Sequence, residues 1–259
     1  MNDTQSVFIR DNSMALQEEL EQSGNWLFKH RSNLPLLMIG VIVMCMRNFH
    51  YLGQSETIDE YWEALCFFIS FIGLGIRAFT IGHTPKGTSG RNTKEQIAET
   101  LNKSGIYSVV RHPLYLGNYF IWLGISLFPH QWELTIICIL VFWIYYERIM
   151  FAEEAFLRRK FGKNYEDWAS ETPAFIPNFK LWKRPDLEFS IKNVLKREYN
   201  GLFVIIISMA ALELTGNLFV HGRLEFGLLW RIILVLGFIV WAALRILKKK
   251  TLLLNVDGR

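Results

Sequence analysis

The apolar residues of this 259-residue chain are gathered in blocks and are not spread at the spacing of a one-sided amphipathic helix. Each block approaches the roughly 20 residues that a helix needs to cross a hydrocarbon core of about 30 Å. The pattern therefore predicts an all-α integral membrane protein with about six transmembrane helices. The expected spans are Leu34 to Phe49, Tyr61 to Thr80, Leu114 to Phe128, Trp132 to Phe151, Gly201 to Val220 and Phe226 to Leu247.

Polar stretches divide the chain into three parts. Residues 1–33 form an N-terminal arm, in which apolar and acidic residues alternate over 4–22 as in a short surface helix or a partly ordered segment. Residues 34–185 form the expected membrane core. Residues 186–259 combine a basic surface segment with the last two spans, a helical pair that we expect to be an addition to the core.

The positive charge is sorted by loop. Alternate connections and both termini hold 23 of the 28 Lys and Arg residues, counting Arg148 with the segment that follows it. The opposite connections hold only Arg47 and Arg223. Since cytoplasmic loops of membrane proteins are enriched in Lys and Arg, both termini are expected in the cytoplasm. A net charge of +4 distributed in this way does not indicate a nucleic-acid partner.

The cysteines give no sign of a disulfide framework or a metal site. Cys45, Cys66 and Cys138 all lie inside apolar spans, with no CxxC pair and no histidine at ligand spacing. We expect them to be core residues and expect no bound metal.

A first polar cluster stands where a loop meets the third span, in the stretch GIYSVVRHPLYLG over residues 105–117. Pro113 suits the first helical turn, because its missing N–H would have no intrahelical partner there. Tyr107, Arg111, His112 and Tyr115 thus place polar chemistry at a membrane edge.

A second polar cluster, Glu153 and Glu154, ends the fourth span. The short turn at residues 129–131 makes the third and fourth spans a hairpin, so His112 and Glu153 must return to the same membrane face. We expect both in one cytosolic pocket. Two simpler interpretations remain open: Arg111 and His112 as ordinary juxtamembrane cations, and Glu154 as a surface residue paired with Arg158 one turn later.

The two clusters together resemble a known family. GIYSVVRHPLYLG, followed after a hairpin by EEAFLRRKFGKNYEDWASETPAFIP, is similar to the isoprenylcysteine carboxyl methyltransferase and phospholipid methyltransferase superfamily of integral membrane enzymes. The resemblance covers roughly residues 70 to 180. It implies S-adenosyl-L-methionine as methyl donor, a bacterial-type member in the inner membrane, and a lipid-like or prenylated acceptor.

The resemblance also implies roles for particular residues. Arg111 and Arg148 would be catalytic and face the acceptor. The chain departs from the family pattern at two places. Many members have a His and an apolar pair where this chain has Glu99 to Asn102, and they commonly have an Arg at the position of Ile149. The implied cofactor-binding residues are Asn92, Glu99, Leu101, Asn102, Tyr107, His112, Pro113, Tyr115, Glu153 and Glu154.

The residue types suit such a donor independently of the resemblance. The donor carries a carboxylate, an ammonium, a sulfonium and a ribose diol, so its pocket needs a cation, a carboxylate and aromatic surface. Methyl transfer from a sulfonium depends on orientation and on exclusion of water more than on a nucleophilic side chain. Ionised carboxyl or phosphate oxygens accept a methyl group without a strong base, and basic residues would gather such acceptors.

Three alternatives stay open at this stage. One is amine N-methylation of a phospholipid head group. Another is an NADPH-dependent double-bond reductase of sterol reductase type, although such enzymes show Asn-Tyr-x-Gly-Glu where this chain has residues 114–118 as Leu-Tyr-Leu-Gly-Asn. A transporter or scaffold would account for the intramembrane charges Arg77, Glu213 and Arg231, which either pair with one another or line a path for lipid head groups.

Overall fold

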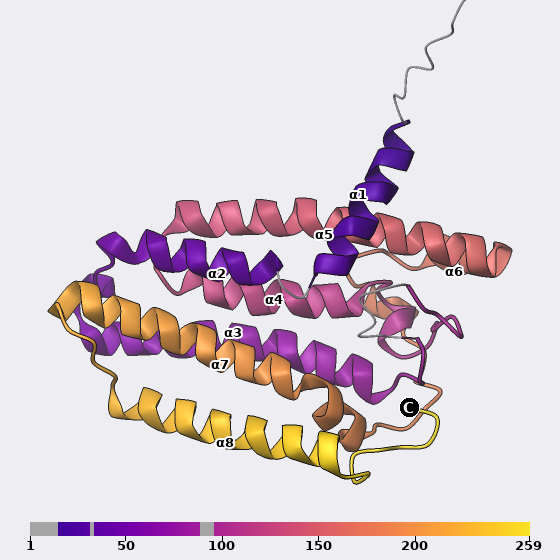
Figure 1. Ribbon diagram of the computed structural model, residues 1–259. Helices are drawn as coiled ribbons and strands as arrows, with labels where there is room; N and C mark the ends of the chain where they lie inside the picture. The colour runs from indigo at the N-terminus through magenta and orange to yellow at the C-terminus, as the bar shows by residue number, and fades with distance from the viewer. Residues whose placement is uncertain (1–14, 32–33, 89–95) are drawn as a thin grey trace, which may run out of the picture.

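The computed structural model describes residues 15–31, 34–88 and 96–259, and within those ranges the regular structure is helical (Figure 1). A single bridge pairs Gly105 with Lys183. The α-helices are α1 (Leu16–His30), α2 (Leu34–Cys45), α3 (Glu56–Gly82), α4 (Pro113–Leu127), α5 (Trp132–Phe161), α6 (Lys163–Glu171), α7 (Ile191–His221) and α8 (Leu228–Lys250).

Four of these helices, α3, α5, α7 and α8, are long and apolar enough to cross a membrane. The helices α2 and α4 coincide with the first and third expected spans but have only 12 and 15 residues. The structure therefore supports an all-helical protein with four candidate membrane spans, and the count of six stays a prediction. Figure 1 shows α2, α3, α4, α5, α7 and α8 lying side by side along a common direction, with α1 crossing α5 at a steep angle.

Two helices are longer than their hydrophobic blocks. The fourth span was expected to end at Phe151, but α5 continues to Phe161 because Glu, Ala, Leu, Arg and Lys are all good helix formers. It ends at Gly162, whose φ of 53° suits a residue without a Cβ, and α6 follows at once. Likewise α7 starts at Ile191, ten residues before the apolar block, where Ser190 accepts a hydrogen bond from the Asn193 N–H at 3.3 Å.

The core lies among α2, α3, α4 and α7. Ile42, Ile125, Ile205 and Met209 are almost completely buried there. By contrast, α8 exposes Leu228, Val235, Phe238 and other large apolar side chains. Such exposure on a spanning helix is what contact with lipid requires.

Close contact between α3 and α4 depends on glycine. A Cβ on Gly73 would lie 2.3 Å from the Gly117 carbonyl oxygen, and one on Gly124 would lie 2.3 Å from the Cys66 carbonyl oxygen. Small residues allow membrane helices to approach this closely. Since α3 and α4 form two walls of the site described below, these glycines set its width.

We expect Gly73→Ala to destabilise the protein by about 1–3 kcal/mol, the usual cost of overpacking a close contact. The clash is with backbone atoms of α4, which cannot rotate away. Thermal unfolding in detergent would measure the change. The matched control is Gly75→Ala on the same helix, where nothing lies within 4 Å of the added methyl group. Equal melting temperatures for the two variants would contradict this account.

Candidate active site

The segment before α4 is held in place by its backbone. Gly105 has a φ of 60°, a conformation that favours glycine, and its N–H donates to the Lys183 carbonyl at 3.0 Å. Val109 and Val110, which follow a short 3₁₀ turn (Ile106–Ser108), are fully buried. The Arg111 and His112 N–H groups then donate to the carbonyls of Pro173 and Ala174. The two halves of the sequence motif are thus joined by backbone hydrogen bonds.

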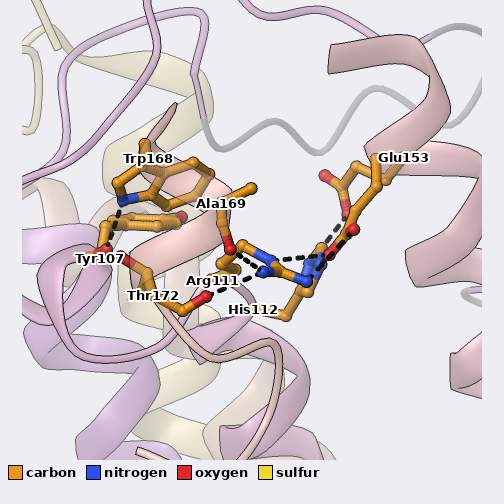
Figure 2. Close-up of polar contacts among 8 residues, drawn as sticks. Tyr107, Arg111, His112, Glu153, Trp168, Ala169 and Thr172 are labelled. Carbon is orange, nitrogen blue, oxygen red and sulfur yellow. Dashed lines mark hydrogen bonds and ion pairs between the residues drawn. The ribbon is translucent and has the colours of Figure 1, made fainter. Parts of the chain in front are cut away.

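Arg111 and His112 meet Glu154 in the C-terminal part of α5. Glu154 accepts hydrogen bonds from Arg111 Nε at 2.9 Å and from His112 Nε2 at 2.9 Å. Arg111 Nη1 also donates to the carbonyls of Ala169 and Thr172, at 2.6 and 2.8 Å. Figure 2 shows the Arg111 side chain between Ala169 and Thr172 on one side and His112 and Glu153 on the other. Arg111 therefore fastens α5 to the end of α6.

Glu153 approaches the other nitrogen of the same imidazole. Its carboxylate oxygen lies 3.7 Å from His112 Nδ1, and a third of its side chain is exposed. Tyr115 stacks on the His112 ring with centroids 5.7 Å apart. The imidazole is thus held between two carboxylates and beneath one aromatic ring, and Glu153 keeps surface that a ligand can reach.

A cavity of about 730 Å³ opens beside this cluster. Its walls come from α3, α4, α5, α6 and α7 and from the loop before α4. Among the described residues, no group of three or more His, Cys, Asp or Glu side chains could hold a metal ion. The residues expected from sequence that line the cavity are Leu101, Asn102, Tyr107, Arg111, His112, Pro113, Tyr115 and Glu153.

Other expected site residues lie elsewhere. Glu154 is behind the wall, where it binds Arg111 and His112, and Arg158 pairs with Glu166 instead. The Glu99 side chain is exposed and packs beside Gly87, away from the cavity lining. Arg148 turns to α1, where it donates to the Ser23 hydroxyl at 3.0 Å. Asn92 lies outside the described residues.

Several cavity residues were not expected from sequence. Arg77 of α3 and Asn118 of α4 line it, although Arg77 was singled out only as an intramembrane charge. Its partner is Glu198 of α7, and not Glu213 or Arg231. Tyr146, Tyr165 and Trp168 also contribute. An arginine inside an apolar span was the available signal, but the partners considered from sequence did not include Glu198.

The protonation states follow from this geometry. Burial alone lowers the pKa of His112, but the carboxylates of Glu153 and Glu154 outweigh it and raise the pKa above the ordinary 6.5. Burial, followed by the charge of Glu153, raises the pKa of the Tyr107 hydroxyl. The site therefore favours the protonated form of His112, beside the Glu153 carboxylate and a neutral Tyr107 phenol.

An all-helical membrane protein with this polar cavity belongs to the class of integral membrane enzymes, and comparison with known proteins gives its family. The family model described as phospholipid methyltransferase matches residues 65–164. A probable protein-S-isoprenylcysteine O-methyltransferase of Oryza sativa subsp. indica is 30% identical over 149 residues, which are 53% of this chain and 75% of the relative. The chain belongs to this family of membrane methyltransferases and is itself a methyltransferase.

Two further relatives show the breadth of the family. The protein-S-isoprenylcysteine O-methyltransferase of Schizosaccharomyces pombe is 34% identical over 96 residues, 34% of this chain and 40% of that protein. The nickel-cobalt-cadmium resistance protein NccN of Alcaligenes xylosoxydans xylosoxydans is 27% identical over 161 residues, 61% of this chain and 70% of that protein. No solved structure matches the chain. The family assignment favours the transferase interpretation over the reductase.

The raised pKa of His112 predicts how stability changes with pH. The folded protein binds this proton more tightly than the unfolded chain, so the contribution is complete below pH 6.5 and is lost as the pH rises through the folded-state pKa. We expect the melting temperature of the wild type to fall as the pH rises above 6.5, and His112→Asn to lack this part of the decrease. Parallel curves for both proteins would show that the pKa of His112 does not differ between the folded and unfolded states.

Proposed function

We propose that this membrane methyltransferase uses S-adenosyl-L-methionine and transfers its methyl group to an anionic oxygen, carboxyl or phosphate, of a lipid-like acceptor. The observation that supports it most is the cavity of about 730 Å³, which brings Glu153, His112 and Tyr107 together from segments on both sides of a helical hairpin. The isoprenylcysteine methyltransferase relatives support a prenylated acceptor in particular.

The residues present fit the proposed donor. Glu153 offers a carboxylate for the ammonium or the ribose hydroxyls of S-adenosyl-L-methionine. His112 and Asn102 offer N–H groups that can hydrogen-bond to its carboxylate. Trp168 and Tyr115 supply aromatic surface for adenine and for the sulfonium. The Trp168 Nε1–H donates to the Tyr107 carbonyl at 3.2 Å, which fixes the indole against the loop.

Orientation is the main task of these side chains. When bound, S-adenosyl-L-methionine supplies a methyl group on a positively charged sulfur, which an ionised oxygen can accept without losing a proton. The carboxylates of Glu153 and Glu154 hold the His112 ring and favour its protonated form, so its role is to position groups. Glu154 and Arg111 act through His112 and through the backbone, as positioning residues.

A second cavity fits the apolar part of the acceptor. It measures about 320 Å³ and lies between α1, α2, α4 and α5, with an almost wholly apolar lining. Trp122 and Tyr146 belong to both cavities. An amphiphile could therefore place its polar end near the donor and its chain among Met38, Leu123 and Phe142.

Amine N-methylation of a phospholipid is the second candidate, because the matching family model is described as phospholipid methyltransferase. An ammonium head group must lose a proton before its nitrogen can accept a methyl group, and His112, whose protonated form Glu153 and Glu154 favour, is poorly suited to take that proton. Oxygen methylation therefore remains the favoured reaction.

We also propose an orientation in the bacterial inner membrane with both termini and the cavity on the cytoplasmic side, as the sorting of Lys and Arg indicates. The division at residues 33 and 185 stays a prediction. Labelling of Glu166→Cys, but not Arg223→Cys, by an impermeant maleimide in inside-out vesicles would support the orientation, and the reverse would contradict it.

Donor binding provides the direct test. Calorimetric titration of the purified wild type with S-adenosyl-L-methionine should show binding, and Glu153→Gln and His112→Asn should each weaken it roughly ten- to a hundredfold, as expected for loss of a charged hydrogen bond. Glu166→Gln is the control, because Glu166 lies on exposed α6 surface outside the cavity. Unchanged affinity in both site variants would place the donor elsewhere, and binding of NADPH alone would favour the reductase.

Methyl transfer to matched acceptors tests the reaction. With radiolabelled donor, we expect product from N-acetyl-S-farnesylcysteine or from an anionic phosphate amphiphile, and little from phosphatidylethanolamine. We expect anionic acceptors to be methylated better than phosphatidylethanolamine because the cavity carries cations that attract anions and lacks a strong base to deprotonate an amine. Transfer to phosphatidylethanolamine alone would establish the amine reaction instead.

A further inference from the structure

Arg77 places a guanidinium inside the cavity, at a level of α3 that is otherwise apolar. It lines the cavity, and a fifth of its side chain is exposed. Its neighbours in the lining include Ile121, Ile125 and Val204. A charge among such side chains is costly in a membrane protein and usually has a functional reason.

The partner of Arg77 comes from α7. Arg77 Nε and Nη2 donate to the two carboxylate oxygens of Glu198 at 2.7 and 2.8 Å, a bidentate pair. Nη1 donates to Asn118 Oδ1 at 2.7 Å. Three of the five guanidinium N–H bonds are thus used within the described chain, and Glu198 holds two of them in the bidentate arrangement that another anion would also take. Glu198 lies outside the residues that the family model matches.

Arg77 is connected to the donor side of the cavity. Asn118 donates to the Tyr146 hydroxyl at 2.9 Å, and the Tyr146 ring lies 5.0 Å from the Tyr115 ring, which stacks on His112. Tyr146 also belongs to the apolar cavity. Arg77 therefore lies where the polar end of an amphiphile would have to be if its chain filled the apolar cavity.

The other arginines on this side of the protein contact other groups. Arg111 is bound to Glu154 and to two carbonyls. The guanidinium of Arg31 lies 3.8 Å above the Phe28 ring. On α5, Arg148 turns to Ser23 and Ile149 is fully buried, so this part of α5 brings no cation to the cavity.

We propose that Arg77 binds the anionic group of the acceptor, and that Glu198 is a built-in carboxylate that competes with the acceptor for it. The inference rests on the proposed function, because it assigns the acceptor end of the same cavity. A carboxylate or phosphate monoester would take the place of one or both Glu198 contacts. The methylated product has lost one negative charge, so Glu198 regains Arg77 and favours release.

The test compares acid and ester forms of one amphiphile, so that the apolar chain is constant. The probes are N-acetyl-S-farnesylcysteine and its methyl ester, with dodecyl phosphate and its methyl ester as the phosphate arm. Binding to protein in lipid nanodiscs is measured by quenching of tryptophan fluorescence, since Trp122 lies between the cavities. No methyl donor is needed.

The variants are chosen to move the acid preference in opposite directions. The ratio of ester Kd to acid Kd should exceed one in the wild type, rise about tenfold in Glu198→Gln, and fall to about one in the double variant Arg77→Gln/Glu198→Gln, as expected for one charged hydrogen-bonding pair. The double variant avoids an unpaired buried carboxylate. Arg223→Gln/Glu225→Gln, an exposed pair at the far end, is the matched control.

The outcomes separate this inference from the proposed function. A ratio of one in the wild type in both probe arms, or a lower ratio in Glu198→Gln, would overturn the role of Arg77 and leave a structural ion pair. If the acid binds more tightly than its methyl ester in only one of the two probe pairs, that pair identifies the acceptor group as a carboxylate or as a phosphate. Absence of S-adenosyl-L-methionine binding, measured separately, would instead refute the proposed function while the ratios still report on Arg77.

Discussion

The structure of the site depends on one ionic cluster, in which Glu154 receives hydrogen bonds from both Arg111 and His112. These groups come from the start of α4 and the end of α5, and Arg111 adds the carbonyls that follow α6. Removing Glu154 would deprive Arg111 and His112 of the carboxylate that they share, and the loss of one partner from a buried ionic cluster is usually costly. The cluster therefore fixes the distance between the start of α4 and the C-terminal part of α5. Glu153, one residue earlier, can face the cavity because Glu154 holds the helix in register.

The order of the motif and the hydrophobic blocks were sufficient to predict the helices and the meeting of α4 with the end of α5. Because a hairpin returns the chain to its starting side, Arg111, His112 and the Glu pair had to come together. Helix ends were harder. Five of the ten residues after Phe151 are charged, yet the segment continues α5 because its helix propensity is high and Gly162 is the first residue that breaks it.

Sequence reasoning was weakest where side-chain direction decides the role of a residue. Successive helical residues point about 100° apart, so Ile149 is buried in the core whereas Arg148, one residue earlier, turns to α1. Glu154 was expected to bind the cofactor, but it lies behind the cavity wall and contacts Arg111 and His112. The partnership of Arg77 with Glu198 joins residues 121 positions apart on helices whose packing no local pattern fixes.

The two ends of the cavity differ in origin, and this difference has a physical consequence. The end proposed for the donor is built largely from the stretch that the family model matches, whereas the opposite end takes Asn200, Gly201 and Val204 from α7, beyond that stretch. Because α7 is a separate helix, this part of the wall can change without disturbing the ionic cluster. Since α8 packs against α7, the C-terminal helical pair would hold that wall against Arg77 rather than simply anchor the chain.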